Sequence, residues 1–266
     1  MLFVISLMVI HLVQAQEMVN NKGLSLYFGP SFPIGHFADK NPSNNLSGYA
    51  RPGESAVISF DQPFYKHLGL VAELYGERNG LNTTVLANQF AGTWFFNGLG
   101  SGYPRQYPNW TIDKKSWYLE SVLLGICQEF SLRKNSKISL IAKAMIGIAL
   151  GQSPELDAKS ESDTSYTTIR QNGASAFGFS YSVSGLIKYR LNPKIHLLLQ
   201  AAYFATANLD FKNVTETIIS TNGGLILPKA YSFSNSVMPI VLESSTGPSK
   251  QPISTINVLI GIGLTL

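Results

Sequence analysis

The sequence predicts an all-β protein, an eight-stranded antiparallel up-and-down transmembrane β-barrel. Three observations support this prediction: segments of alternating apolar and polar residues recur along the chain, their connections alternate between short and long, and the chain closes on such a segment. Successive side chains of a strand point to opposite faces, so each segment has one largely apolar face. A sheet in hydrocarbon must close on itself, because an open edge would leave backbone groups unpaired.

The last predicted strand, residues 253–266, shows the pattern most clearly. One face carries Ile256, Val258, Ile260, Ile262, Leu264 and Leu266, and the other carries Asn257, Leu259, Gly261, Gly263 and Thr265. We expect the aliphatic face to contact lipid and this strand to pair with the first one, which closes the barrel.

The other strands follow from the same alternation. We expect the eight strands near residues 24–36, 49–60, 67–80, 116–131, 138–151, 174–190, 195–211 and 253–266. The short connections cover 61–66, 132–137 and 191–194, and the long ones cover 37–48, 81–115, 152–173 and 212–252. Short turns on one side and long loops on the other are typical of an outer-membrane barrel with both termini in the periplasm.

Three strands test which face meets lipid. The apolar faces are Ile138, Leu140, Ala142, Ala144, Ile146, Ile148 and Leu150; Phe177, Phe179, Tyr181, Val183, Ile187 and Tyr189; and Ile195, Leu197, Leu199, Ala201, Tyr203, Ala205, Ala207, Leu209 and Phe211. The alternative is a soluble lipocalin-like barrel, which would expose the opposite faces. Those faces are rich in Gly, Ser and Asn, and charged residues are only 14% of the chain against a typical ~25%. The apolar faces are therefore predicted to meet lipid.

Two segments depart from the simple pattern. In the fourth strand, Glu120 and Gln128 share the parity of Val122, so we expect a β-bulge or a shifted register there. In the last long connection, Ser220-Thr221-Asn222-Gly223-Gly224 lies between two β-rich runs. This predicts a hairpin above the membrane, with a ten-stranded barrel as the alternative.

The N-terminus predicts export. Residues 1–15 read as a signal peptide, with an apolar run from Leu2 to Val13 and cleavage after Ala15. The run is too short for a spanning helix of roughly 20 residues. Residues 16–23 are expected to form a short periplasmic segment before the barrel of residues 24–266.

Several short motifs resemble a known family. They are Gly29-Pro30-Ser31-Phe32-Pro33-Ile34-Gly35-His36-Phe37, Ser47-Gly48-Tyr49-Ala50, Gly69-Leu70-Val71-Ala72-Glu73-Leu74-Tyr75-Gly76-Glu77-Arg78-Asn79-Gly80, and Tyr118-Leu119-Glu120 followed by Leu123-Leu124. In layout, residues 24–266 resemble the outer-membrane protein β-barrel domain family, which includes PorT-like and OmpA-like eight-stranded barrels. The resemblance implies the fold and the membrane, and it implies no reaction.

The faces turned away from lipid carry the candidate interior residues. Eight strands enclose a space that side chains can fill, which disfavours an open porin-type pore. We expect an interior polar network formed by Glu73, Tyr75, Lys143, Lys188, Gln200 and Asn257. Buried charges need partners, and Glu73 with Lys143 is the predicted pair. A satisfied polar core is favoured over a proton or ion path.

The sequence offers little catalytic or metal-binding chemistry. After signal removal the histidines are His36, His67 and His196; they lie on separate strands or strand ends, without metal-ligand spacing or a triad. Cys127 is the single cysteine and sits in an apolar run, which favours a small buried residue over a nucleophile. The acidic residues Glu155, Asp157, Glu161 and Asp163 lack the order of a calcium loop. We therefore expect no enzyme, no cofactor and no metal.

The aromatic residues of the second long connection form the candidate loop surface. It consists of Trp94, Phe95, Phe96, Tyr103, Tyr107 and Trp110, which are predicted to pack over the barrel mouth or lie in the interfacial belt, with sugar, lipid or partner binding as the alternative. A net charge of +4 without basic stripes gives no support for nucleic-acid binding.

Three functional hypotheses remain, in this order. The first is a structural or interaction barrel in the outer membrane of a Gram-negative-type bacterium, which displays loops or docks an envelope or secretion partner. The second is a narrow channel for small or hydrophobic solutes, and the third is a lipid-modifying enzyme. The expected partners are outer-membrane lipid and lipopolysaccharide, the barrel-assembly machinery and an envelope protein.

Overall fold

The computed structural model describes most of the predicted barrel. The described residues are 22–41, 44, 46–65, 67–92, 109–131, 136–162, 165–212, 215–220, 240–245 and 249–266. The predicted signal peptide, residues 1–15, and residues 16–21 of the predicted periplasmic segment lie outside the described residues.

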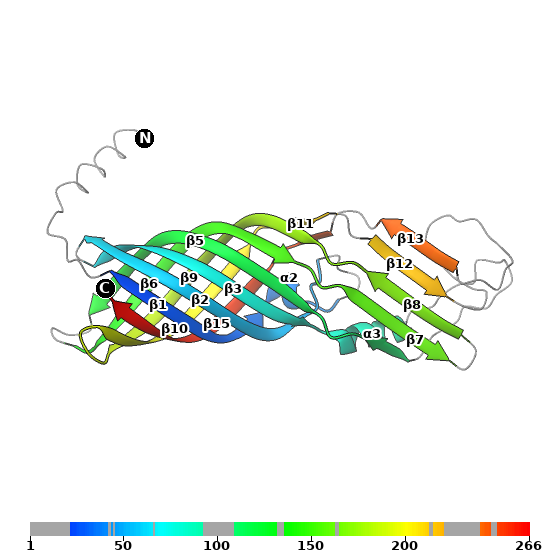
Figure 1. Cartoon of the computed structure of the whole chain (residues 1–266), viewed down its shortest axis with the longest axis horizontal. Coiled ribbons are helices and arrows are strands. Elements are labelled where there is room, and N and C mark those ends of the chain that lie inside the picture. Colours follow the sequence, from blue (N-terminus) through cyan, green and yellow to red (C-terminus); the bar gives the residue numbers. More distant parts are fainter. Residues whose placement is uncertain are drawn as a thin grey trace, which may run out of the picture.

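Eight long strands form a closed antiparallel barrel, which confirms the predicted fold class (Figure 1). They are β1 (Gly23–Pro33), β2 (Ala50–Tyr65), β3 (Leu68–Leu81), β5 (Ser116–Ser131), β6 (Ile138–Gln152), β9 (Ser175–Arg190), β10 (Ile195–Thr206) and β15 (Ser254–Thr265). The order around the barrel is β1-β15-β10-β9-β6-β5-β3-β2, and β2 returns to β1. Strand β15 pairs with β1 from Gly23 opposite Thr265 to Pro33 opposite Thr255, so the last strand closes the sheet as expected.

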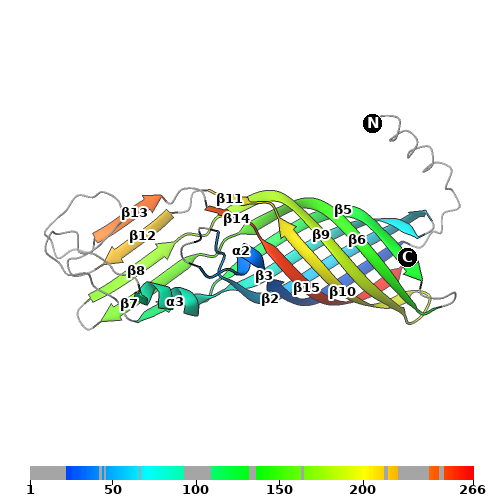
Figure 2. The same ribbon diagram turned by 180° about the vertical axis from the view of Figure 1, so that it is seen from behind.

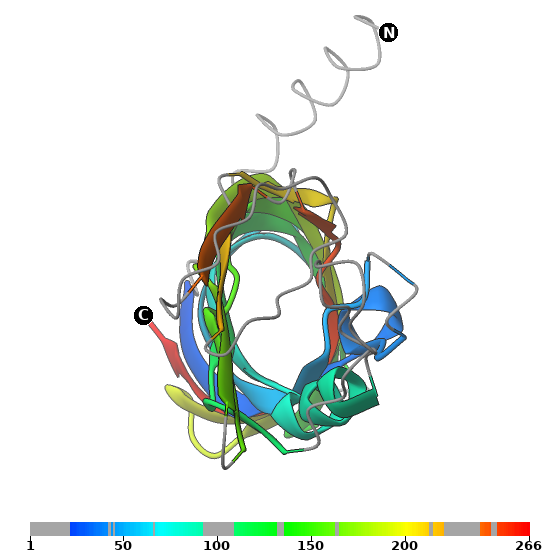
Figure 3. The same cartoon turned by 90° about the vertical axis from the view of Figure 1, so that its right-hand side faces the viewer.

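The two ends of the barrel differ. At one end lie the connections β2–β3, β5–β6 and β9–β10, together with the start of β1 and the end of β15. We call it the short-turn end. At the opposite end, the long-loop end, the other connections extend well beyond the barrel (Figures 1 and 2). Viewed from the long-loop end, the strands form a closed ring, with both helices on one side of it (Figure 3).

The outer face of the barrel is apolar. Large side chains that project from the barrel wall include Leu26 (60% exposed), Leu124 (60%), Ile148 (65%), Phe177 (73%) and Ile260 (69%). The polar and small residues between them point inward and are buried, as Ser121, Ser180 and Asn257 illustrate. A belt of exposed aliphatic and aromatic side chains around a closed barrel is the surface that hydrocarbon solvates. We name this surface the apolar belt.

The prediction of a bulge or a shifted register in strand β5 is wrong. Its register with β3 and with β6 is continuous over the described pairs. Glu120 and Gln128 do point outward with Val122, Leu124 and Ile126, and they flank these three apolar residues. Eight residues of strand span about 26 Å, close to the height of a barrel's apolar band, so both polar side chains lie at its edges. The unbroken parity needs no bulge.

The seventh predicted strand is also corrected. It leaves the barrel wall after Thr206, and Leu209–Phe211 form the separate strand β11, which pairs with β14 (Ser249–Gln251). Leu209 and Phe211 are 0% and 1% exposed, so they do not belong to the lipid-facing set. Alternation alone continues through the break, because it contains no information about where a strand stops pairing with its neighbours.

The long connections contain secondary structure, and apart from the hairpin in the last of them the sequence did not predict it. They include α2 (Gly35–Ala38), α3 (Thr83–Gly92), β4 (Trp110–Ile112), β7 (Leu156–Ser162), β8 (Ser165–Gln171), β12 (Thr215–Ser220) and β13 (Ile240–Ser245). Strands β13-β12-β8-β7-β4 make a five-stranded sheet, here called the distal sheet, which extends from the long-loop end (Figures 1 and 2). No helix in the described part of the chain is both long and apolar enough to cross a bilayer.

The distal sheet settles the prediction for the last long connection. Strands β12 and β13 pair antiparallel as a hairpin, and β12 also pairs with β8. The predicted hairpin is therefore confirmed, and the ten-stranded alternative is wrong, because neither strand joins the barrel. The predicted turn residues Thr221 to Gly224 lie outside the described residues.

Candidate functional site

The middle of the barrel contains a buried lysine with two acidic partners. Lys143 Nζ lies 2.9 Å from Glu73 Oε1 and 3.4 Å from Asp61 Oδ1, and it donates a hydrogen bond to Ser59 Oγ at 2.9 Å. The Tyr27 ring centroid is 5.5 Å from the same nitrogen. The Lys143 and Glu73 side chains are 0% and 2% exposed. The pair predicted from the sequence is thus in direct contact, and we call these residues the lysine cluster.

A second interior cluster surrounds Glu77, closer to the long-loop end. The Glu77 carboxylate accepts hydrogen bonds from Tyr75 Oη, from Asn79 Nδ2 and, at 3.0 Å, from Thr255 Oγ1. Asn257 Nδ2 donates to Tyr75 Oη at 2.9 Å and to Thr255 Oγ1 at 3.1 Å. Among the described residues Glu77 has no ion-pair partner, so donor hydrogen bonds alone satisfy it. The Tyr75 ring stacks on Phe204 at 4.4 Å.

The six predicted interior residues do not form one network. Glu73 meets Lys143, and Tyr75 meets Asn257, in the two clusters above. Lys188 lies at the short-turn end and pairs with Glu129 at 3.4 Å. Gln200 is 1% exposed, and its Oε1 has no hydrogen-bond partner among the described residues. The six side chains are thus distributed along the barrel.

Several participants were missed from the sequence, among them the charged or amide residues Asp61, Glu77, Asn79 and Glu129. Glu77 and Asn79 continue the inward parity of Glu73 and Tyr75 along β3, so extending that face by two more positions would have found them. Asp61 and Glu129 lie near strand ends, where parity alone does not separate interior side chains from turn residues.

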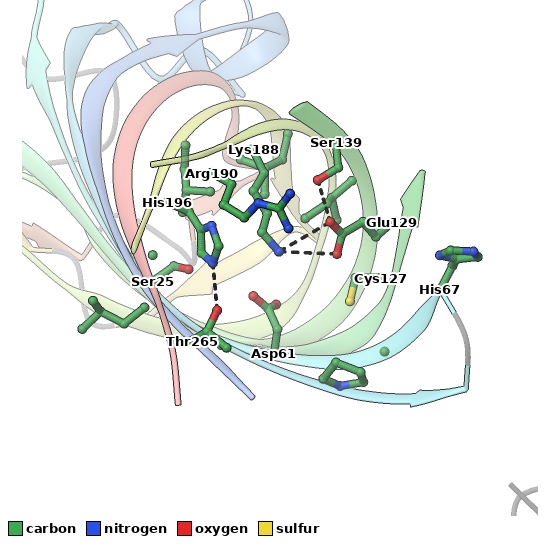
Figure 4. Close-up of a pocket in the computed structure, with 18 of the residues that line it drawn as sticks. Ser25, Asp61, His67, Cys127, Glu129, Ser139, Lys188, Arg190, His196 and Thr265 are labelled. Carbon is green, nitrogen blue, oxygen red and sulfur yellow. Dashed lines mark hydrogen bonds and ion pairs between the residues drawn. The ribbon is translucent and has the colours of Figure 1, made fainter. Parts of the chain in front are cut away.

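A cavity of about 520 Å³ opens at the short-turn end, below the lysine cluster. Its charged lining residues include Asp61, Glu129, Lys188 and Arg190 (Figure 4). Ser139 Oγ donates to Glu129 Oε1 at 2.5 Å, and Lys188 Nζ lies 3.4 Å from Glu129 Oε2 (Figure 4). Both signs of charge are present, so this cavity at the short-turn end is polar without a strong preference for anions or cations.

The three histidines of the described part lie apart from one another. His196 Nε2 lies 2.8 Å from Thr265 Oγ1, while His67 lies far across the mouth from it (Figure 4). His36 is at the other end of the barrel, in α2, where Asn44 Nδ2 is 3.2 Å from its Nδ1. Cys127 lines the cavity at the short-turn end and is partly buried. Within the described residues no group of three or more His, Cys, Asp or Glu side chains could hold a metal ion.

Apolar residues fill the long-loop end of the barrel. We call Phe37, Trp117, Leu209, Phe211 and Ile253 the apolar plug; each is at most 9% exposed. Trp117 makes edge contacts with Phe37 at 5.6 Å and with Phe211 at 5.9 Å, and its Nε1 donates to Gly48 O at 3.0 Å. Leu209 packs so closely on Gly151 and Gly178 that a Cβ at either position would lie 2.5 Å from it. The plug residues belong to the same buried cluster as Tyr75 and Phe204 beside Glu77.

Above the plug, a cavity of about 330 Å³ lies between the barrel mouth, α3 and the distal sheet, with Tyr49, Phe90 and Leu156 in its lining. Trp110, from the predicted loop surface, is 8% exposed and packs on Phe90 at 5.2 Å. Trp110 thus belongs to a buried cluster between α3 and the distal sheet, with Ala158 and Ile169. The other predicted surface residues, Trp94, Phe95, Phe96, Tyr103 and Tyr107, lie outside the described residues.

The acidic residues of the third long connection face cations of the protein. Glu155 Oε2 lies 3.4 Å from Lys115 Nζ, and Asp157 Oδ2 lies 3.7 Å from both Lys159 Nζ and Arg170 Nε. The Glu161 side chain and Asp163 lie outside the described part.

The first long connection is organised by Asp39. Its carboxylate accepts hydrogen bonds from Asn44 Nδ2 at 2.6 Å and from the backbone N–H groups of Lys40 and Asn41 at 2.7 and 3.1 Å. These bonds, with the Asn44 bond the strongest, lower the pKa of Asp39. Because this pKa is lower in the folded protein than in the unfolded chain, the bonds stabilise the connection above the unfolded pKa and are lost as the pH falls through the folded value.

We expect the pKa of the Asp39 carboxyl to lie below the usual aspartate range in the folded protein, and Asn44→Ala to raise it. Carbon-detected NMR of the carboxyl group in the refolded barrel measures both values. Asp113→Asn, which removes a carboxyl elsewhere at the long-loop end, is the control and leaves the Asp39 titration unchanged. An identical titration midpoint with and without Asn44 would contradict the assignment.

Comparisons with known proteins add only distant similarity. No family model matches the chain, and no curated protein matches it. The resemblance to PorT-like and OmpA-like barrels therefore stays a prediction. Among solved structures, the attachment invasion locus protein Ail of Yersinia pestis is 11% identical, with a TM-score of 0.42 over 94% of this chain and 100% of that one.

Two other solved structures are similar to the same degree. The outer membrane protein OprG of Pseudomonas aeruginosa is 9% identical, with a TM-score of 0.41 over 94% of this chain and 97% of that one. The outer membrane protease OmpT of Escherichia coli is 9% identical, with a TM-score of 0.45 over 94% of this chain and 98% of that one. At these values the similarity carries no argument about what this chain does.

Proposed function

We propose that this chain is a non-enzymatic outer-membrane β-barrel protein that holds the distal sheet outside the cell as a binding surface for an envelope or surface partner. The observation that carries the proposal is the arrangement at the long-loop end: the connections build an ordered five-stranded sheet, and the apolar plug fills the barrel beneath it. The long connections form a sheet beyond the barrel and add no strands that would widen it into a pore.

The membrane placement follows from the apolar belt. A closed barrel with exposed Ile148, Phe177 and Ile260 has an outer face that water would solvate poorly. Bacterial barrels of this type have short turns in the periplasm and long loops outside. We therefore place the short-turn end and both termini in the periplasm and the distal sheet at the cell surface.

The alternative of a narrow channel has one feature in its favour, the cavity of about 520 Å³ at the short-turn end. A solute that entered there would meet the buried ion pair of Lys143 and Glu73 and then the apolar plug. Moving ions past a desolvated pair and through packed aromatic side chains is costly. These features favour display over conduction.

The display function is tested by removing part of the distal sheet. Leu156 pairs with Gln171, so the β7–β8 hairpin can be excised and its ends joined by an Asn-Gly turn. We expect the shortened barrel to insert and to shift on an unboiled gel as the full chain does. In intact cells, a photo-crosslinker at Lys159 of the full chain is expected to give a discrete product. Purified full chain, added as a competitor, is expected to abolish that product. The matched position is Phe177, on the apolar belt.

Two results would contradict the proposal. One is an identical crosslinking pattern at Lys159 and at Phe177, because the lipid-facing position cannot reach a surface partner. The other is steady ion conductance in planar bilayers or turnover of lipid by the refolded full chain, which would favour the channel or the enzyme.

A further inference from the structure

A basic notch lies on the outside of the barrel, beside the distal sheet. It is a cavity of about 430 Å³ formed where β3, β5, β6 and β9 reach the long-loop end. Its charged lining consists of Arg78, Lys114, Lys115 and Glu155, three cations against one carboxylate. We call this set, with Tyr118, the basic notch. The charge is local, because the whole chain carries only +4.

The cations of the notch are only partly neutralised. Lys115 Nζ lies 3.4 Å from Glu155 Oε2, and Arg78 Nη1 lies 3.9 Å from Glu54 Oε1. Both pairs are exposed, with the Arg78 and Glu54 side chains at 55% and 56%, so each interaction is weak. The Lys114 side chain is exposed and has no ion-pair or hydrogen-bond partner among the described residues. Three cations thus face two carboxylates, and Lys114 is the cation left without a partner for an anion from outside.

Arg78 is oriented by its neighbours. Its Nε donates a hydrogen bond to Ser116 Oγ at 3.3 Å, and its guanidinium carbon lies 5.6 Å from the centroid of the Tyr118 ring. Stacking and a single Nε bond hold the planar group and leave terminal N–H donors that suit a phosphate. An Arg held in this way binds an oxyanion with less loss of side-chain entropy than a free one.

The position of the notch relative to the apolar belt identifies the ligand class. On the same outward faces, four residues before Arg78 and four after Tyr118, lie Leu74 (56% exposed) and Val122 (55%). Four residues of strand span about 13 Å, so the cations lie directly above the hydrocarbon level. Ile148 and Phe177, 65% and 73% exposed, extend this apolar surface under the notch.

From these observations we propose that the basic notch binds the phosphate of a phosphorylated, acylated glycolipid of the outer leaflet, with the acyl chains lying on the apolar belt below it. Tyr118 is at the depth where aromatic residues prefer the membrane interface. The inference rests on the membrane placement proposed above, which sets the long-loop end at the outer leaflet. It goes beyond that function because it assigns specific residues to a lipid.

The test uses the full chain refolded in phosphatidylcholine vesicles that contain bisphosphorylated lipid A, or the same lipid A after phosphatase treatment. Lipid A retained on the barrel is counted by native mass spectrometry, and its dissociation constant is obtained by competition with labelled lipid A. We expect the wild type to retain the phosphorylated lipid. The double variant Lys114→Gln with Lys115→Gln is expected to weaken retention roughly thirtyfold, because each lysine near an anionic surface strengthens binding about fivefold.

The matched control is Lys40→Gln with Lys212→Gln, which removes the same charge from the long-loop end at exposed positions that do not line the notch. Equal weakening by the two double variants, or equal retention of the dephosphorylated lipid, overturns the proposal. Displacement of lipid A by millimolar inorganic phosphate would assign the notch to a soluble anion and overturn the lipid. Heat-modifiability of each sample reports insertion, so an inserted barrel that retains no lipid A refutes this inference and leaves the display function standing.

Discussion

Lys143→Met is expected to destabilise the folded barrel by about 3–5 kcal/mol, because it leaves a buried carboxylate without its cation. Glu73 is 2% exposed at its side chain and lies 2.9 Å from Lys143 Nζ, so water cannot replace the lost partner. Asp61, 24% exposed, loses the same cation at 3.4 Å. Urea unfolding of the barrel refolded in lipid vesicles, followed by the gel shift of unboiled samples, measures the change.

Glu73→Gln is expected to cost less, about 1–3 kcal/mol, because Asp61 and Ser59 still contact the ammonium group. The double variant Lys143→Met with Glu73→Gln should recover part of the loss, with a coupling energy of about 1 kcal/mol or more. Lys188→Met is the control: its pair with Glu129 is partly exposed and contributes up to about 1 kcal/mol. Strictly additive single changes at 73 and 143 would show that the contact has no energetic role.

Trp117→Ala is expected to have the second largest effect, about 3–5 kcal/mol, because it leaves a void in the centre of the apolar plug. The change removes the edge contacts with Phe37 and Phe211 and the hydrogen bond to Gly48 O. Since the plug joins the barrel wall to the long connections, their described parts should also become more sensitive to protease. Urea unfolding and limited proteolysis of vesicle-inserted protein measure the two effects.

Trp117→Phe is a smaller change. It keeps one aromatic ring in the plug but loses the Nε1 donor and part of the ring volume, so a cost of about 1–3 kcal/mol is expected, below that of alanine. Phe177→Leu, at a position 73% exposed on the apolar belt, is the matched control outside the plug and should cost under about 1.5 kcal/mol. Proteolysis of the long connections that is the same in the alanine variant and in the wild type would show that the plug does not anchor them.

The two interior clusters and the plug suggest how the barrel is stabilised from within. Polar side chains occupy the middle, where Lys143 pairs with carboxylates and Glu77 accepts hydrogen bonds, and aromatic side chains occupy the long-loop end. This order is consistent with the display function proposed above. It also explains why the cavity at the short-turn end and the one above the plug are separate sites.

The barrel itself could be predicted from the sequence, because its constraint is local and periodic. Lipid requires an apolar residue at every second position, and this alternation is visible along β6, β9 and β15 without any knowledge of their neighbours. The contact between Glu73 and Lys143 followed from the same parity, since two opposite charges facing one narrow interior have few alternative partners.

The break after Thr206 and the regular register of β5 could not be predicted, because they depend on which strand each segment pairs with. Alternation continued through Leu209 and Phe211, and only packing on Gly151 and Gly178 turned these side chains into the plug. In the long connections no lipid imposes a period, so α3 and the strands β4, β7 and β8 of the distal sheet left no comparable pattern.

The sequence by itself determined that an apolar face recurs eight times and therefore that a closed, lipid-facing barrel forms, because unpaired backbone groups are too costly in hydrocarbon. Only the tertiary structure decided which inward and outward polar residues meet. Arg78 and Lys114 lie on separate segments, and strand register and the paths of the connections together place them in one notch above the belt. Such contacts are set by long-range pairing, which local periodicity does not encode.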